Sequence, residues 1–183
     1  MQANIAVGLL ETSSIALGVE ACDVMVKMAS VDLVKTNIIG KGKQTILIQG
    51  PVGEVESSLR AGVETLGTSL VHQFIIRNVH QGVLDALEGR RAVQKLEALG
   101  VIETKDAVAC VQAADAAAKA AKVHLIDVKL VVGGGKGYVT MTGEVAAVRT
   151  AVGAGISAVP KEMLVGHTVI AQADPQLLAQ FGK

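Results

Sequence analysis

The sequence predicts an α+β fold of two tandem ferredoxin-like (split βαβ) repeats, each an antiparallel sheet with helices packed on it. Short apolar runs alternate with segments of helical periodicity in the order β-α-β-β-α-β. That order then occurs a second time: residues 100–104, Gly-Val-Ile-Glu-Thr, repeat residues 8–12, Gly-Leu-Leu-Glu-Thr, at an offset of 92 that becomes 93 beyond a glycine-rich loop. Matches that keep one order over this length indicate a duplication.

The elements of the first repeat follow from local patterns. Strands are expected at 5–10, 31–39, 44–49 and 69–77, and helices at 14–28 and 52–66. In the first helix Ile15, Val19, Cys22 and Val26 recur every three or four residues, which is typical of one buried face. The second copy closes with a strand at 164–171 and a short tail around 175–181. We therefore place the first repeat at 5–85, a connection at 86–97 and the second repeat at 98–183.

Two glycine-rich loops join strands at equivalent places in the repeats. They are Ile39-Gly40-Lys41-Gly42-Lys43 and Val132-Gly133-Gly134-Gly135-Lys136-Gly137. Glycine at such places indicates a sharp turn or the close approach of another group, and a hairpin turn with positive φ is the simpler of these readings. Neither loop fits the phosphate-binding pattern Gly-x-x-x-x-Gly-Lys-Ser/Thr, because Gln44 and Gly137 follow the lysines.

Composition narrows the function classes. The 183 residues carry 17 basic and 17 acidic side chains without a basic arm, so nucleic acid is not an expected partner. Charged residues interrupt the apolar runs before the roughly 20 residues of a membrane span, and no signal segment opens the chain, so a soluble, cytoplasmic protein is expected. A mean hydropathy of +0.47 at zero net charge favours large surfaces buried against other copies.

Catalytic and metal-binding patterns are missing from the sequence. The glutamates Glu11 and Glu103 each stand isolated at a strand end, and no nucleophile–base pair is evident. The histidines are scattered without metal-ligand spacing: His72, His80, His124 and His167. We therefore expect no enzyme and no metal site.

The order of several motifs resembles a known family. These motifs are Val7-Gly8-Leu9-Leu10-Glu11-Thr12, the helix end Asp23-Val24-Met25-Val26-Lys27-Met28-Ala29, the Gly-Lys-Gly-Lys loop and Gly50-Pro51-Val52-Gly53-Glu54-Val55. Together they are similar to the bacterial microcompartment shell domain over about residues 5–180. Two such domains in the unpermuted order resemble the trimeric T-type shell proteins of propanediol-utilising compartments.

The resemblance implies a structural role. Three chains of such proteins form a flat pseudohexamer with a central pore for small metabolites, and these tiles assemble with other shell proteins around cytosolic enzymes. By resemblance the pore would be lined by Ile39, Gly40, Lys41, Gly42, Lys43, Gly133, Gly134, Gly135 and Lys136. We further expect Lys41, Lys43 and Lys136 to make the pore rim positive and to favour small anions.

Three residues resemble the contacts that such tiles make along their edges. Lys27 and Lys119 match the family's edge lysine, although a lysine near the end of any amphipathic helix also complements the helix dipole. His80 matches the last residue of the family's Pro-Arg-Pro-His segment, here Arg77-Asn78-Val79-His80, and also fits an ordinary surface histidine.

Some T-type relatives hold an iron–sulfur cluster through a cysteine in the first loop, where this chain has Gly40. Such clusters need thiolates, whereas Cys22 and Cys110 lie in predicted helices and are expected to be buried small hydrophobes. We therefore expect no cofactor. The alternative function is a ferredoxin-like small-molecule-binding or signalling protein that uses the glycine loops as a ligand clamp.

Overall fold

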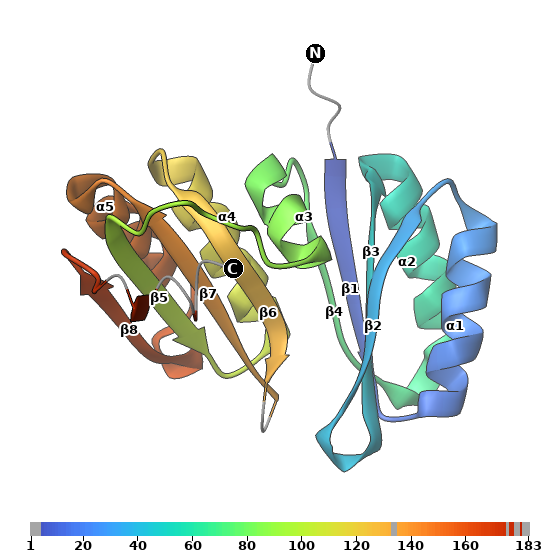
Figure 1. Ribbon diagram of the computed structural model, residues 1–183. Helices are drawn as coiled ribbons and strands as arrows, with labels where there is room; N and C mark the ends of the chain where they lie inside the picture. The colour runs from blue at the N-terminus through green and yellow to red at the C-terminus, as the bar shows by residue number, and fades with distance from the viewer. Residues whose placement is uncertain (1–4, 133–134, 175, 178–179, 181–183) are drawn as a thin grey trace. The chain divides into compact units, whose positions relative to one another are not determined.

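The computed structural model describes residues 5–132, 135–174, 176–177 and 180. The chain divides into two compact units, residues 1–79 and 80–183 (Figure 1). Residues 80–85 are part of the predicted first repeat, whereas by packing they lie in the second unit.

Unit 1 has the predicted β-α-β-β-α-β order. Its four strands form one antiparallel sheet in the order β2-β3-β1-β4, and α1 packs beside α2 on one face of that sheet (Figure 1). This arrangement confirms the predicted ferredoxin-like repeat. The elements are β1 (Ile5–Thr12), α1 (Ile15–Met28), β2 (Asp32–Ile39), β3 (Lys43–Pro51), α2 (Val52–Leu66) and β4 (Leu70–Ile76).

Unit 2 repeats the arrangement and has one additional helix, α3, before its first strand in the chain. The sheet order is β6-β7-β5-β8, with α4 and α5 on one face, while α3 packs against β6 and α4 (Figure 1). The elements are α3 (Gln81–Glu88), β5 (Ala98–Thr104), α4 (Ala107–Ala120), β6 (His124–Val132), β7 (Lys136–Gly143), α5 (Val145–Ser157) and β8 (Leu164–Ile170).

Glycines on the central strands let the helices approach the sheet closely. A Cβ on Gly8 of β1 would lie 2.9 Å from side-chain atoms of Leu59 and Val55, both on α2. Gly100 of β5 has the same surroundings in unit 2, with Val148 of α5 at 2.8 Å. In a chain without tryptophan and with only two phenylalanines, the core is thus packed by close backbone approach rather than by large rings.

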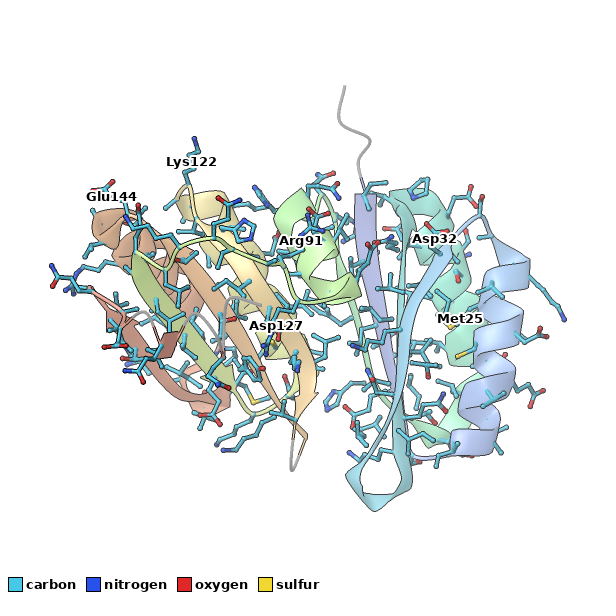
Figure 2. The ribbon with its side chains drawn as sticks, in the orientation of Figure 1. Met25, Asp32, Arg91, Lys122, Asp127 and Glu144 are labelled. Atoms are coloured by element: carbon cyan, nitrogen blue, oxygen red, sulfur yellow. The ribbon has the colours of Figure 1, made fainter. Side chains whose placement is uncertain are left out.

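The connection between α3 and β5 is held against β6. The backbone N–H of Arg91 donates to the carbonyl oxygen of Ile126 at 2.7 Å. Arg90 Nε lies 3.3 Å from Oδ2 of the buried Asp127, which the Tyr138 hydroxyl also reaches at 3.4 Å. Figure 2 labels Arg91 and Asp127 in this region. Opposite charge and hydrogen bonds compensate the burial of the carboxylate.

Candidate functional site

The glycine loops lie at one end of each sheet, between β2 and β3 and between β6 and β7. Gly42, in a short turn over Gly40–Gly42, has φ +72°, and the equivalent Gly135 has φ +87°. Side chains rarely adopt this left-handed conformation, so the turn itself requires glycine at these two positions. Gly133, Gly134 and the side chain of Lys41 lie outside the described residues, so the structure places only the rest of the predicted pore lining.

Gly40 is different from Gly42. Its φ lies outside the left-handed region, and a Cβ built on it would have no neighbour within 4 Å. Within the single chain, therefore, neither backbone conformation nor space demands glycine at this position.

A repeated ion pair stands beside each loop. Lys43 Nζ, on the first residue of β3, lies 2.8 Å from Glu11 Oε1 near the end of β1. Lys136 Nζ lies 2.9 Å from Glu103 Oε1 at the equivalent place in unit 2. The expectation that Glu11 and Glu103 are isolated is therefore wrong.

Strand register explains this pair. Glu11 stands opposite Thr45 in the antiparallel β1–β3 ladder, and Lys43 is two residues before Thr45 on the same face. Diagonal neighbours of this kind lie within reach of long side chains. The recurrence of both the glutamate and the lysine at the repeat offset is the sequence signal that could have revealed the pair.

The predicted edge lysines also belong to repeated pairs. Lys27 Nζ lies 2.6 Å from Asp23 Oδ2, one turn earlier on α1, and Lys119 Nζ lies 2.5 Å from Asp115 Oδ2 on α4. Their position in the last turn also complements the helix dipole.

His80 is the N-cap of α3. Its Nδ1 accepts a hydrogen bond from Gly82 N–H at 3.1 Å, and its own N–H donates to Asp115 Oδ1 at 2.8 Å. The His80 N–H and the Lys119 ammonium thus meet at the Asp115 carboxylate, a link that the sequence alone does not reveal.

The two cysteines do not fit an iron–sulfur cluster, because neither lies in a glycine loop. Cys110 on α4 is fully buried and its thiol donates to the Lys129 carbonyl oxygen at 3.5 Å, as expected for a small core residue. Cys22 on α1 is half-buried against the unit 1 core, so the same expectation holds for it only in part. Burial raises the pKa of both thiols.

We expect the Cys110 thiol to be unreactive in the folded protein. Because burial raises its pKa, the thiolate that attacks alkylating reagents is scarce at pH 8, and each unit of pKa reduces it about tenfold. In a Cys22→Ala variant, a chromogenic disulfide reagent should detect no thiol in native buffer and one after denaturation. Rapid native reaction would show that α4 opens locally.

The two units differ in one exposed surface, which we call the α1/β2 surface and define by Val19, Val26, Leu33 and Ile38. These side chains are 60%, 39%, 41% and 67% exposed. Their counterparts at the repeat offset are Val111, Ala118, Leu125 and Leu130, which are 1%, 8%, 3% and 4% exposed. In unit 2, α3 packs against the helix and strand that carry these counterparts. Exposed apolar residues on a helix and a strand that contact each other indicate an interaction surface.

Two open hollows lie away from the described parts of the glycine loops. The one in unit 2, about 730 Å³, lies between the 92–97 connection and residues that include Lys122 and Glu144, both labelled in Figure 2. The one in unit 1, about 520 Å³, lies between α2 and β4. A ligand clamp formed by the loops would need a concave site beside them, and neither of these two hollows supplies one.

No helix in the described part of the chain combines the length and apolarity needed to cross a bilayer. The family model described as the BMC domain matches residues 6–79 and again 98–173.

Similar proteins and a similar solved structure support the same family assignment. The chain is 39% identical over 178 residues to the bacterial microcompartment shell protein PduT of Citrobacter freundii, covering 96% of this chain and 97% of that protein. It is 40% identical to the major carboxysome shell protein of Halothiobacillus neapolitanus over 46% of this chain and 89% of that protein. A crystal structure of a microcompartment protein from Desulfitobacterium hafniense superposes with a TM-score of 0.92 at 41% identity, covering 96% of this chain and 98% of that one. The chain belongs to the BMC-domain family, as a bacterial microcompartment shell protein with two tandem domains.

Proposed function

We propose that this protein is a structural tile of a microcompartment shell in which three chains form a pseudohexamer around a central pore. The observation that carries the proposal is the α1/β2 surface, which is exposed in unit 1 although its counterpart in unit 2 is buried. A chain with one covered and one uncovered copy of a surface is suited to associate head to tail. Head-to-tail contacts close into a ring when the rotation permits, and three chains supply six equivalent units.

The second exposed apolar region fits the same association. Val165 and Ile170, on β8 at the other end of the sheet order, are 40% and 37% exposed. In a head-to-tail ring, the end of unit 2 that carries β8 would meet the α1/β2 surface of the next chain. The exposed apolar side chains of these two regions would then be removed from water, a favourable change of about 25 cal/mol per Å².

The pore of this ring would be lined by Ile39–Lys43 and Gly133–Lys136 of each chain. Gly42 and Gly135 serve the turn, whereas Gly40 has no role within the single chain, which is consistent with loops that approach one another at an axis. The positive rim needs revision, because Glu11 and Glu103 partner two of its three lysines. We propose a pore with alternating carboxylates and ammonium groups, to which Lys41 adds the net positive charge.

Along the outer edge, Lys27, Lys119 and His80 are the proposed contacts to other shell proteins. The lysine ammonium groups are already paired to aspartates, yet the two lysine side chains remain 72% and 45% exposed and free to contact a neighbouring tile. The tile would lie in the cytoplasm as part of the shell, passing small metabolites and carrying out no catalysis itself.

The proposal predicts that the purified protein forms ordered sheets or tubes. Electron microscopy should show hexagonal arrays with a spacing of about 65–70 Å, the size expected for six units of about 90 residues in a ring. A Lys119→Ala variant should keep the mass of a trimer and lose the arrays. A discrete monomer or dimer that binds a metabolite tightly would instead favour the ligand-clamp function.

A further inference from the structure

The segment after β8 repeats the start of α3. His80 and Asp174 occupy equivalent places, each accepting with its side chain from the N–H two residues later, at 3.1 Å and 2.8 Å. Each also accepts with its carbonyl oxygen from the N–H three residues later, at 2.9 Å in both cases. The sequence continues the match, since Val83, Leu84 and Leu87 of α3 correspond to Leu177, Leu178 and Phe181. The tail therefore starts with the same two hydrogen bonds as α3.

In unit 2, α3 is the element that packs on the surface equivalent to the exposed one. It lies beside β6 and α4 (Figure 1), and the His80 N–H donates to the Asp115 carboxylate of α4. Asp115 is consequently only 10% exposed at its side chain, whereas Asp23, its counterpart on α1, is 57% exposed. The α1/β2 surface thus offers both the apolar side chains and the carboxylate that α3 uses in unit 2.

The start of the tail is held on its own unit. Leu177 and Ala173 pack against Leu99 and Ile126, and Arg90 Nη1 donates to the Gln180 carbonyl oxygen at 2.7 Å. Because the start of the tail is already fixed on its own sheet, few further residues need to become ordered when the tail binds another surface. This lowers the entropy cost of association.

We propose that residues 174–183 of one chain dock on the α1/β2 surface of the next chain, as α3 docks on the equivalent surface within unit 2. The Asp174 N–H donates to Asp23 of the next chain. The apolar residues of the tail other than Leu177, which stays packed on its own unit, cover Val19, Val26 and Leu33. This inference rests on the proposed ring and names the segment that joins its chains.

The proposed contact between chains differs in one residue from the contact that α3 makes within unit 2. Where α3 has the imidazole of His80, the tail has the carboxylate of Asp174, which would come close to Asp23. Lys27, whose ammonium lies 2.6 Å from Asp23, supplies the compensating charge. Replacing Asp174 with His should therefore tighten the trimer and lower its sensitivity to salt.

Cross-linking tests the docking directly. In a Cys22→Ala/Cys110→Ala background, the pair Asp23→Cys/Asp174→Cys is treated with a short bifunctional thiol reagent and compared with the pair His80→Cys/Asp115→Cys. The control pair should cross-link within one chain without a change in mass. The test pair should give covalent dimers and trimers and no larger species, and mixing the two single variants should give dimers alone.

The outcomes separate this inference from the proposed function. A cross-link within one chain, or no cross-link in a protein that still has the mass of a trimer, would overturn the docking and leave the ring standing. A monomer without cross-links would overturn both.

A substitution on the surface gives an independent readout. Leu33→Asp should weaken trimer formation about 10- to 150-fold, the loss expected when one apolar side chain no longer becomes buried. Met28→Asp is the matched control, because Met28 and its counterpart Ala120 are both exposed and lie outside the covered surface. Equal effects of the two substitutions on trimer mass would contradict the docking.

Discussion

Replacing both loop lysines by glutamate, Lys43→Glu/Lys136→Glu, is expected to destabilise each unit and to shift permeation through assembled tiles toward cations. In the wild type the two ammonium groups lie 2.8 Å and 2.9 Å from Glu11 and Glu103. The substitutions remove both attractions and leave two carboxylates side by side in each unit, which disfavours their ionised forms. Because the lysines are partly exposed, solvent screens the change, and we expect a loss of about 1–2 kcal/mol per unit.

The charge-swapped variant is the matched control. Adding Glu11→Lys and Glu103→Lys restores both pairs in reverse orientation and returns the net charge to that of the wild type. Thermal unfolding should recover most of the lost stability, and the ratio of anion to cation flux across assembled sheets should return toward the wild-type value. If the double and the swapped variants unfold alike and show the same flux ratio, the pairs have neither role.

The second prediction with a large effect concerns two glycines of α5. Replacing Gly155 by alanine should lower the unfolding free energy, whereas replacing Gly153 should raise it. A methyl group on Gly155 would lie 2.5 Å from Ile102 Cδ1 and 2.9 Å from the Ala113 carbonyl oxygen of α4. Gly155→Ala should therefore cost about 1–3 kcal/mol of unfolding free energy, as overpacking does. Gly153→Ala meets nothing within 4 Å and should gain up to about 1 kcal/mol from helix propensity.

Gly62, the counterpart of Gly155 in unit 1, gives a prediction of intermediate size. A methyl group on Gly62 would lie 2.6 Å from the sulfur of Met25, which lies between α1 and α2 (Figure 2). Methionine is flexible, so Gly62→Ala should cost less than Gly155→Ala, where a backbone oxygen cannot give way. Calorimetry should rank the unfolding temperatures as Gly153→Ala, wild type, Gly62→Ala and Gly155→Ala, from highest to lowest. A Gly155→Ala variant as stable as the wild type would show that α4 and α5 can separate at little cost.

The sequence was sufficient for the fold because the duplication is regular. Hydrophobic periodicity placed the strands and helices, and the recurring offset paired Lys27 with Lys119 and the first loop with the second. The Glu–Lys pairs were missed because they depend on strand register, which joins residues 32 or 33 positions apart. The assignment of α3 to unit 2 was equally hidden, since a short amphipathic helix does not reveal which neighbour will cover it.

One pair of differences between the repeats shows why the packing of side chains could not be predicted from the sequence. In unit 1, Gly18 of α1 faces Gln44, whose Oε1 would lie 2.2 Å from an added Cβ. In unit 2 the equivalent helix residue is Cys110, which faces Gly137, where an added Cβ would lie 2.5 Å from the cysteine Cβ. Large and small residues have changed places across the same contact. Either residue alone looks like an unrelated difference between the repeats, and only the three-dimensional contact makes them a pair.

The location of the glycine loops in the assembled tile tests the account most directly. A symmetry-averaged density map of the sheets formed by this protein should show three chains per hexagonal unit. The Gly40–Gly42 turn and the loop that ends at Gly135 should alternate around the threefold axis, six loops around one opening, with each C-terminal segment crossing to the next chain. Loops at the periphery of the assembly, or chains paired about a twofold axis through the α1/β2 surface, would contradict it.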